Sequence, residues 1–308
     1  MQVSFIVPLF NCLAYTQAMV TSLRATLPAG LSYEIVLVDD GSTDGTREWL
    51  AGLSAPFRVV LNPENLGYAG ANNRGAAIAQ GDWLALLNND LILLPGWWEP
   101  LAAVQRQLGG RAGVMGNVQR NAQTGAVDHA GLFINAKGKP EHLRRRGWWP
   151  RASRRVPAVT GACCLIQREL WQALGGFDEG YRNGCEDVDL CFRAEAAGRI
   201  NAVALRSVVR HHVSASPGRK LRDEANTLRL TRRWHERLVA LGQPAWCRAH
   251  FEAHLPEPRD FPDPRLARTT ACFLLGLKRQ PPRRAAEGMR AALAVELNRW
   301  HALFSSSV

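Results

Sequence analysis

The sequence has no long apolar run and no paired cysteine motif. No stretch of the 308 residues reaches the roughly 18 apolar residues that a membrane-spanning helix needs. The seven cysteines are odd in number and form no C-x-x-C pair, which argues against a disulfide framework and a zinc cluster. The segment Met1 to Phe10 has no basic residues ahead of its apolar ones, so we expect no signal peptide. These absences exclude a multi-pass membrane protein and favour a cytoplasmic location.

Acidic residues are scarce in the last third of the chain. Residues 205–308 carry 19 basic and 9 acidic groups, whereas residues 1–204 carry 19 and 18. One explanation is compositional bias, because 34 of the 38 basic residues are Arg. The other is a tail that contacts an anionic surface, such as the inner face of the cytoplasmic membrane. The tail could equally pack on the rest of the protein or form a homodimer.

A nucleic-acid partner is a third explanation for the basic pI of about 9.9. Trp148 and Trp149 lie between arginines at Arg144–Arg155, a mixture that also occurs in some nucleic-acid-binding segments. The recognisable nucleic-acid-binding modules are missing from the sequence, so we expect no such partner. The Arg/Trp segment is then either a loop beside a substrate site or a surface that faces the solvent.

Short apolar runs and helical segments alternate over the first 110 residues. The predicted strands are Val3–Val7, Glu34–Val38, Phe57–Leu61 and Trp83–Leu87. The predicted helices between them are Ala14–Leu27, Thr43–Leu53 and Gly70–Gln80. Continuous apolar strands separated by helices indicate βαβ units. The sequence therefore predicts an α/β fold with a mainly parallel central sheet flanked by helices.

The pattern is less regular after residue 110. We expect further elements at Val159–Gln167 (strand), Glu186–Ala197 (helix), Ile200–Leu205 (strand) and Arg219 to about Ala240 (helix). A linker follows at Pro256–Pro264, and residues 265–308 are predicted to be helical. We therefore expect one domain at residues 1–218 and a helical, basic C-terminal extension at residues 219–308.

Polar clusters follow each of the first four predicted strands. They are Pro8–Asn11, Asp39–Ser42, Asn62–Asn65 and Asn88–Asp90. Ligands of parallel α/β sheets bind beyond the carboxyl ends of the strands. The recurrence of these clusters at one edge of the sheet therefore indicates a nucleotide-type site.

Each of these motifs also has a purely structural explanation. A carboxylate in Asp39–Asp44 could bind a nucleobase imide, but Asp and Ser are equally typical of turns and helix N-caps. The Asn88–Asp90 cluster suits a hard divalent cation shared with a diphosphate, or simply a turn. Asp187 at a helix start could be a general base for a hydroxyl, or an acid that offsets the helix dipole. The adjacent His211 and His212 should point opposite ways on an extended segment, so at most one enters a given site.

The order of the motifs resembles that of family 2 glycosyltransferases. The matching series is VPLFN, DDGSTD, N-x-G-x-x-x-A-x-N-x-G, NND, GGFDE, EDVDLCFR and HHVSAS, over about residues 3–240. It is most similar to the rhamnosyltransferase-like branch, which builds bacterial surface polysaccharides. The resemblance implies a GT-A catalytic domain, a nucleotide-diphospho-sugar donor, a divalent metal (Mn²⁺ or Mg²⁺) and inversion at the anomeric carbon.

The resemblance also assigns roles to individual residues. The donor nucleotide-binding residues would be Pro8, Phe10, Asn11, Asp39, Asp40, Ser42, Asn65, Gly67, Asn73, Asn88 and Asn89. The metal would be held by Asp90 and by His211 or His212. Asp187, next to Glu186, would be the catalytic base. The first acid of the family's DxD motif is Asn88 here, which leaves fewer charges for the ion.

The expected acceptor is a hydroxyl of a glycan or of a lipid-linked saccharide. A loop around Arg144–Arg155, or the segment after His212, would close over the site and exclude water. The alternative within the same resemblance is a catalytically inactive scaffold that binds a nucleotide sugar. The presence of Asp40, Asp90, Asp187 and His211 favours the enzyme.

Overall fold

A computed structural model describes residues 2–145, 151–212, 219–254 and 263–305. The chain divides into two compact units. The sheet unit comprises Met1–Leu132 and His142–Arg222, and the tail unit comprises Phe133–Glu141 and Asp223–Val308. Trp148, Trp149, the segment directly after His212 and most of the expected linker lie outside the described residues. The domain boundary expected at residue 218 stays a prediction.

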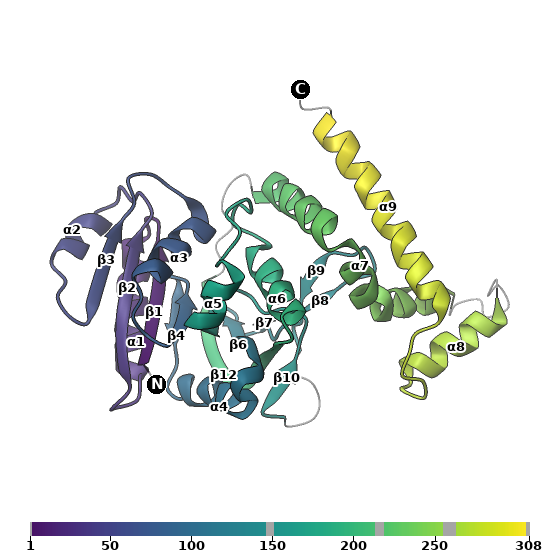
Figure 1. Cartoon of the computed structure of the whole chain (residues 1–308), viewed down its shortest axis with the longest axis horizontal. Coiled ribbons are helices and arrows are strands. Elements are labelled where there is room, and N and C mark those ends of the chain that lie inside the picture. The colour runs from purple at the N-terminus through teal and green to yellow at the C-terminus, as the bar shows by residue number, and fades with distance from the viewer. Residues whose placement is uncertain (1, 146–150, 213–218, 255–262, 306–308) are drawn as a thin grey trace. The chain divides into compact units, whose positions relative to one another are not determined.

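The first half of the sheet unit follows the predicted alternation of strands and helices (Figure 1). Its elements are β1 (Gln2–Leu9), α1 (Leu13–Thr26), β2 (Ser32–Asp39), α2 (Thr46–Ala51), β3 (Phe57–Leu61), α3 (Gly67–Ile78) and β4 (Trp83–Leu87). Helix α2 starts three residues later than predicted. Gly45 precedes it with a φ of 87°, a left-handed conformation that cannot belong to the helix.

The second half contains elements that the sequence pattern did not reveal. It is built from β5 (Leu91–Leu93), α4 (Trp98–Leu108), η1 (Gly109–Arg111), β6 (Ala112–Asn121), β7 (Val127–His129), β10 (Ser153–Arg155), β11 (Cys163–Gln167), α5 (Arg168–Leu174), α6 (Glu186–Ala196) and β12 (Ile200–His211). The short strands β8 (Leu132–Ile134) and β9 (Pro140–His142) pair in a separate two-stranded sheet, and most of their residues belong to the tail unit. The strand expected at Ile200–Leu205 runs on to His211. This extension carries a histidine to the end of the strand.

In the described residues, ten strands form the central sheet, in the order β10-β12-β6-β11-β4-β1-β2-β3, with β5 and β7 attached to β12 and β6. The neighbours β3, β2, β1 and β4 run parallel, and β12 runs parallel to β6. Strand β11 runs antiparallel between β4 and β6, so β6 and β12 point the same way as the first four strands. The carboxyl ends of all six parallel strands therefore lie at one edge. The α/β fold with a mainly parallel sheet and C-terminal helices is confirmed.

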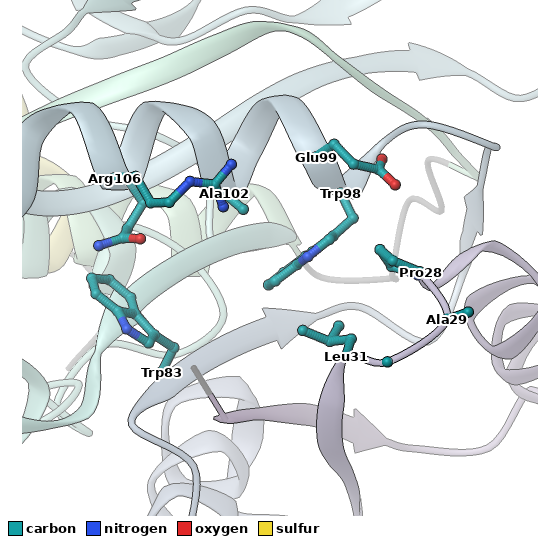
Figure 2. A pocket seen from close by; sticks show the side chains of 10 residues that line it. Pro28, Ala29, Leu31, Trp83, Trp98, Glu99, Ala102 and Arg106 are labelled. Atoms are coloured by element: carbon teal, nitrogen blue, oxygen red, sulfur yellow. The ribbon is translucent and has the colours of Figure 1, made fainter.

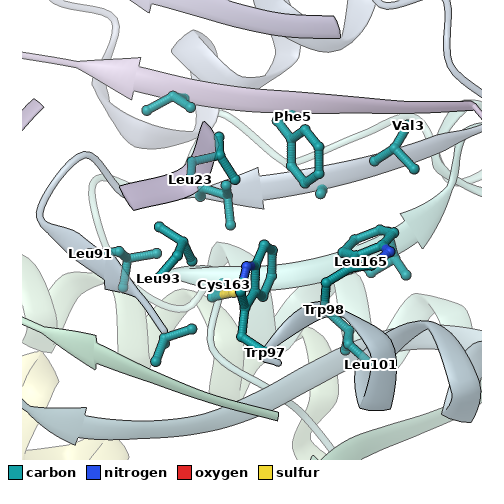
Figure 3. Close-up of a cluster of buried hydrophobic side chains, with 14 of the residues drawn as sticks. Val3, Phe5, Leu23, Leu91, Leu93, Trp97, Trp98, Leu101, Cys163 and Leu165 are labelled. Carbon is teal, nitrogen blue, oxygen red and sulfur yellow. The ribbon is translucent and has the colours of Figure 1, made fainter. Parts of the chain in front are cut away.

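The main hydrophobic core packs against one face of this sheet. Phe5 of β1 lies in the middle of it, with its ring centroid 5.6 Å from Trp98 and 6.3 Å from Trp97 of the α4 region (Figure 3). All three side chains are at most 3% exposed. Burying aromatic groups of this size contributes several kcal/mol each. The core thus fixes the parallel strands whose ends carry the polar clusters.

Helix α3 covers the other face of the sheet at very short range. A Cβ at Gly75 would lie 2.5 Å from Ile6 and 2.9 Å from Val38, so only glycine allows this approach. The last glycine of the N-x-G-x-x-x-A-x-N-x-G motif is therefore explained by packing.

The tail unit is mainly helical, as expected. Its helices are α7 (Arg219–His254), α8 (Pro264–Leu274) and α9 (Arg283–Ser305). Helix α7 is longer than predicted and has non-helical torsion angles at Trp234. Lys139 in the 133–141 segment lies 3.1 Å from Glu296 of α9 and 3.6 Å from Glu224 of α7, which ties these parts together. None of the helices in the described ranges is both long and apolar enough to cross a bilayer.

Candidate active site

The carboxyl edge of the sheet gathers most of the predicted site residues. Asn11, Asp40, Asp90 and His211 follow or end β1, β2, β4 and β12, which all point to this edge. Strand β11 runs the other way, so its start, after Gly161 and Ala162, lies at the same edge. The N–H of Asn88 donates to the Ala162 carbonyl at 2.8 Å, and the N–H of Gly161 donates to Asp187 at 2.8 Å. The adjacent residues Gly161 and Ala162 therefore connect the Asn88–Asp90 motif to Asp187 through one hydrogen bond on each side.

Asp40 is engaged on both carboxylate oxygens. It accepts hydrogen bonds of 2.9 Å from the Leu66 and Gly67 N–H groups and from the Asn62 side chain. The carboxylate thus satisfies N–H groups at the start of α3, as a helix cap does. The Asn65 side chain donates to the Asp40 carbonyl at 3.1 Å. Asp40, Asn65 and Gly67 hold one another in place at the end of β2.

Asp39 has a different set of partners. Arg47 donates to its carboxylate at 2.7 Å and to the Asn62 carbonyl at 2.6 Å. The Ser42 N–H donates to Asp39 at 3.2 Å. The side chain of Asp39 is fully buried, so it fixes the turn between β2 and α2. These contacts of Asp39 match the structural explanation given for its motif, in which the aspartate forms part of a turn.

The loop after β1 is hydrogen-bonded to the turn between β2 and α2. The Asn11 N–H donates to the Ser42 hydroxyl, and the Thr43 N–H donates to the Asn11 side chain, both at 2.8 Å. Asn11 has a φ of 55°, a left-handed conformation that Asn tolerates better than most residues. Its neighbour Phe10 is 52% exposed, and Pro8 is partly buried within β1. An exposed aromatic ring beside fixed polar groups offers a surface on which a base can stack.

Asn73 lies on α3, and its side chain forms hydrogen bonds with the loop after α5. Its side chain donates to the Phe177 carbonyl at 3.0 Å and to Glu179 at 2.8 Å, and it accepts from the Phe177 N–H at 2.9 Å. These contacts position the Gly175–Glu179 loop.

The Asn88–Asp90 motif contains two buried oxygens that lack hydrogen bonds. Within the described residues, Asn88 Oδ1 and Asp90 Oδ1 have no hydrogen-bond partner. His211 Nε2 lies 3.1 Å from Asp90 Oδ1, but not in hydrogen-bonding geometry. Two ligands of one octahedral cation, each about 2.1 Å from it, lie about 3.0 Å apart. The spacing and the unsatisfied oxygen therefore fit a shared divalent cation.

Asn89 and His212 point elsewhere. The Asn89 side chain donates to Thr16 of α1 at 3.0 Å, and the His212 ring lies 4.8 Å from the Tyr15 ring. Antiparallel pairing of β5 with β12 aligns Leu91 with His211 and so brings His211, rather than His212, to Asp90. In the described part of the chain, no group of three or more His, Cys, Asp or Glu residues could hold a metal. A cation at Asp90 and His211 would need further ligands from a substrate or water.

Asp187 sits in the first turn of α6, which begins at Glu186. Its two oxygens accept from the Gly161 and Val188 N–H groups, both at 2.8 Å. Burial raises the pKa of Asp187 above its ordinary value, although these hydrogen bonds and the nearby His142 oppose the rise. A carboxylate with a raised pKa is a better proton acceptor than a solvated one.

The two neighbouring acids of α6 are committed to other contacts. Arg193 donates to Asp189 at 2.7 Å, and the Gly184 N–H donates to Glu186 at 2.6 Å. Both acids are at most 5% exposed, whereas Asp187 is more accessible. Of the three, Asp187 is the one suited to a proton transfer.

A pair of histidines near this site was missed by the sequence interpretation. His129 Nδ1 lies 3.3 Å from His142 Nδ1, and the Thr160 N–H points at His129 Nε2 from 3.4 Å. Nε2 of His129 therefore accepts, and its Nδ1–H donates to His142. Burial lowers the pKa of both rings, most strongly that of His129, so the pair is neutral near pH 7. The short strands β7 and β9 that carry them have no clear sequence signal.

A pocket of about 500 Å³ lies at the other end of the sheet (Figure 2). It is lined by Pro28–Leu31, Trp83, Trp98, Glu99, Ala102, Gln105 and Arg106. Trp83 begins β4 and Leu31 directly precedes β2, so this is the amino edge. The pocket therefore does not belong to the site formed by the motifs.

Comparison with known proteins identifies a family. The sequence model described as "Glycosyl transferase family 2" matches residues 4–175, which is more than half of the chain. The chain is 31% identical over 230 residues to the uncharacterized protein y4gI of Sinorhizobium fredii, covering 70% of this chain and 25% of that protein. It is 29% identical over 212 residues to the N-acetylglucosaminyl-diphospho-decaprenol L-rhamnosyltransferase of Mycobacterium tuberculosis, covering 60% of this chain and 68% of that one.

A solved structure extends the comparison to the fold. The crystal structure of GalNAc-T7 with UDP, GalNAc and Mn²⁺ superposes with a TM-score of 0.63 over 81% of this chain and 51% of that one. The sequence identity is 18%, so the likeness concerns the fold alone. It is the GT-A fold expected from the motifs, and that expectation is confirmed.

Proposed function

Because the chain belongs to glycosyltransferase family 2, we propose that it is an inverting, metal-dependent transferase. The donor would be a nucleotide-diphospho-sugar, and the acceptor a hydroxyl of a glycan or lipid-linked saccharide. One observation carries the proposal. The Asp90 oxygen without a hydrogen bond beside His211 and the carboxylate of Asp187, whose pKa burial raises, lie at one edge of the sheet, connected through Gly161 and Ala162.

Asp90 and His211 would hold the metal, Mn²⁺ or Mg²⁺. When bound, the cation would neutralise charge on the diphosphate leaving group. Asn88 Oδ1 is a further buried oxygen without a hydrogen bond in the described residues, available to a metal-bound water or a donor hydroxyl. With only one carboxylate in the motif, the donor's own phosphates would complete the site.

Asp187 would act as the general base. Its carboxylate takes the proton of the acceptor hydroxyl while that oxygen bonds to the anomeric carbon. The bond from this carbon to the diphosphate oxygen breaks, and its electron pair leaves with the nucleoside diphosphate. Attack from the face opposite the leaving group inverts the configuration. The hydrogen bonds from Gly161 and Val188 hold the carboxylate in one orientation.

The donor's nucleoside would lie over the loops after β1 and β2. The 52% exposed ring of Phe10 would contact the base, and Asn11 and Ser42 would shape the loop beneath it. Asp40 would contribute to base recognition through the lone pair that its three hydrogen bonds leave free. Pro8, Asp39, Asn65, Gly67, Asn73 and Asn89 would act by positioning these loops.

We propose a role in bacterial surface-polysaccharide synthesis at the inner face of the cytoplasmic membrane. The Mycobacterium tuberculosis relative is named for a diphospho-decaprenol substrate, which supports a lipid-linked acceptor here. The basic tail unit supports peripheral membrane contact, and a homodimer is compatible with it.

A donor panel with an Asp187→Asn variant tests the function. Each nucleotide sugar, with Mn²⁺ or Mg²⁺, is scored by thermal shift, donor hydrolysis and transfer. The variant should keep donor binding and lose transfer by about 10²- to 10⁴-fold. Asp82→Asn, a carboxylate at the amino edge, is the matched control and should transfer normally. Full transfer by Asp187→Asn would refute the assigned base, and donor binding without transfer by the unaltered chain would favour the inactive scaffold.

A further inference from the structure

The turn between α8 and α9 spans Leu275–Pro282 (Figure 1). Within the described residues, it carries the two most exposed large apolar side chains. Leu275 is 75% exposed and Leu277 is 74% exposed. A single exposed leucine is ordinary on a protein surface, but two exposed leucines in one turn form a small apolar patch.

The backbone of this turn is well ordered by hydrogen bonds. The Gly276 N–H donates to the Phe273 carbonyl at 3.0 Å, and the Leu277 N–H donates to the Cys272 carbonyl at 2.9 Å. Gly276 has a φ of 76°, so the end of α8 has the Schellman arrangement. The residue at the position of Leu277 commonly packs back on the helix in this motif. Here Leu277 is 74% exposed instead, although the backbone bonds of the cap are formed.

Basic residues surround the two leucines. Residues 264–286 contain six basic groups and no acidic group. Lys278, Arg279 and Arg283 are exposed and form no ion pair among the residues described. Arg284 lies 3.4 Å from Asp263, which precedes the segment. The local charge is therefore strongly positive around an apolar tip.

We propose that the Leu275–Pro282 turn inserts its two leucines into an anionic lipid bilayer, with Lys278, Arg279 and Arg283 at the headgroups. Two weak signals, an apolar insertion and a basic cluster, together give stable but reversible membrane attachment. This assigns residues to the membrane contact proposed above. Its readout is vesicle binding, which does not depend on sugar transfer.

The charge distribution favours a bilayer over a protein partner. A two-fold contact between two copies of this turn would place like charges against one another. Two leucine side chains also supply far less apolar area than the roughly 1,600 Å² that a standard protein interface buries. A bilayer needs no complementary shape and supplies the negative charge.

Vesicle co-sedimentation of the full chain tests the proposal. Phosphatidylcholine vesicles are compared with vesicles that also contain phosphatidylglycerol, at low and high salt. Binding should require the anionic lipid and weaken with salt. The Leu275→Ser/Leu277→Ser variant should lose on the order of tenfold or more in binding. The Lys278→Gln/Arg279→Gln/Arg283→Gln variant should lose a similar factor and most of the salt dependence.

Two matched controls remove equivalent groups elsewhere. Val295→Ser alters another exposed apolar residue, and Arg106→Gln/Arg111→Gln removes exposed charge from the sheet unit. Both should bind vesicles as the unaltered chain does. Equal binding by the leucine variant, or no preference for anionic lipid, would overturn the proposal. Sedimentation that showed a dimer dissociating in the leucine variant would identify a second copy as the occupant instead. Donor hydrolysis should be the same in all variants, which separates this outcome from a failure of the proposed function.

Discussion

The two edges of the central sheet treat their buried carboxylates in opposite ways. At the amino edge, Glu34 accepts hydrogen bonds from Ser4, the Gln80 N–H and Arg58. Burial alone would raise its pKa, but these three donors outweigh it and the pKa is lowered. At the carboxyl edge, burial outweighs the hydrogen bonds of Asp187, and its pKa is raised. The contacts of Glu34 therefore stabilise its ionised form, whereas the surroundings of Asp187 destabilise its ionised form.

The same contrast occurs within the carboxyl edge. Asp40 accepts three hydrogen bonds from protein donors, whereas Asp90 has a buried oxygen without a hydrogen bond in the described residues. Both belong to motifs that the family resemblance assigns to the donor site. The contacts of Asp40 hold the start of α3 in place, and the free oxygen of Asp90 is compatible with the metal-binding role proposed for it.

The largest effect is expected from Asp40→Ala. The change leaves the Leu66 and Gly67 N–H groups without their acceptor, so the free energy of unfolding should fall by about 2–4 kcal/mol. Urea unfolding monitored by circular dichroism measures it. Asp90→Ala is the paired variant and should change stability by less than about 1 kcal/mol. Equal losses in both variants would break the contrast between the two carboxylates.

Asp90→Ala should instead weaken the response to metal. Removing one of two protein ligands should raise the Mn²⁺ concentration needed for half-maximal activity about 10- to 100-fold. The measurement is a metal titration of transfer, with a matching thermal-shift titration in the presence of donor. His211→Ala should resemble it and His212→Ala should not. A metal response that depended on His212 and not on His211 would contradict the geometry.

Glu34→Gln should cost about 1–2 kcal/mol of stability at neutral pH, because a charged hydrogen-bonded group is replaced by a neutral amide. The pKa of Glu34 is lowered in the folded state, so its contribution is present above the unfolded pKa and is lost as pH falls through the folded pKa. The unfolding curves of the variant and the unaltered chain should therefore differ at neutral pH and converge at acidic pH. A difference that persisted at low pH would exclude this linkage.

The smallest effect concerns the pH profile of transfer. Asp187 must be ionised to accept a proton, so activity should rise with pH through a pKa above the ordinary Asp value of about 3.9. At acidic pH, where His142 is protonated, its positive charge lowers the pKa of Asp187, so His142→Phe should move the acidic part of this rise to higher pH. Steady-state kcat/KM against pH checks both. Unlike Glu34, ionised Asp187 opposes folding, because its folded-state pKa is raised.

Much of the fold was predictable from local pattern. Strands β1 to β4 and the helices between them coincide closely with the predicted segments, because buried parallel strands are continuous apolar runs. The elements α4 and β6 were missed, although both are long. Strand β6 contains Gly113, Gly116 and the buried polar residues Asn117 and Gln119, which obscure its apolar character. The reverse direction of β11 also has no local sequence signal.

The candidate site was predictable in its members but not in their contacts. Motif order identified Asp40, Asp90, Asp187 and the His211/His212 pair, and their roles stay predictions. The structure brings His211 to Asp90 because β5 pairs with the extended end of β12. His129 and His142 were not identified, since neither belongs to a recognised motif and they lie on short strands.

The sequence by itself determined the alternation of apolar runs and helices and the spacing of the polar motifs, because both depend on neighbouring residues. Only the tertiary structure decided which carboxylate has a lowered pKa, which has a raised pKa and which has an oxygen without a hydrogen bond in the described residues. The decisive donors, such as the Gly161 N–H for Asp187 and the Gly67 N–H for Asp40, are 26 and 27 residues away along the chain. Burial and hydrogen bonding are set by such distant neighbours, and no local pattern records them.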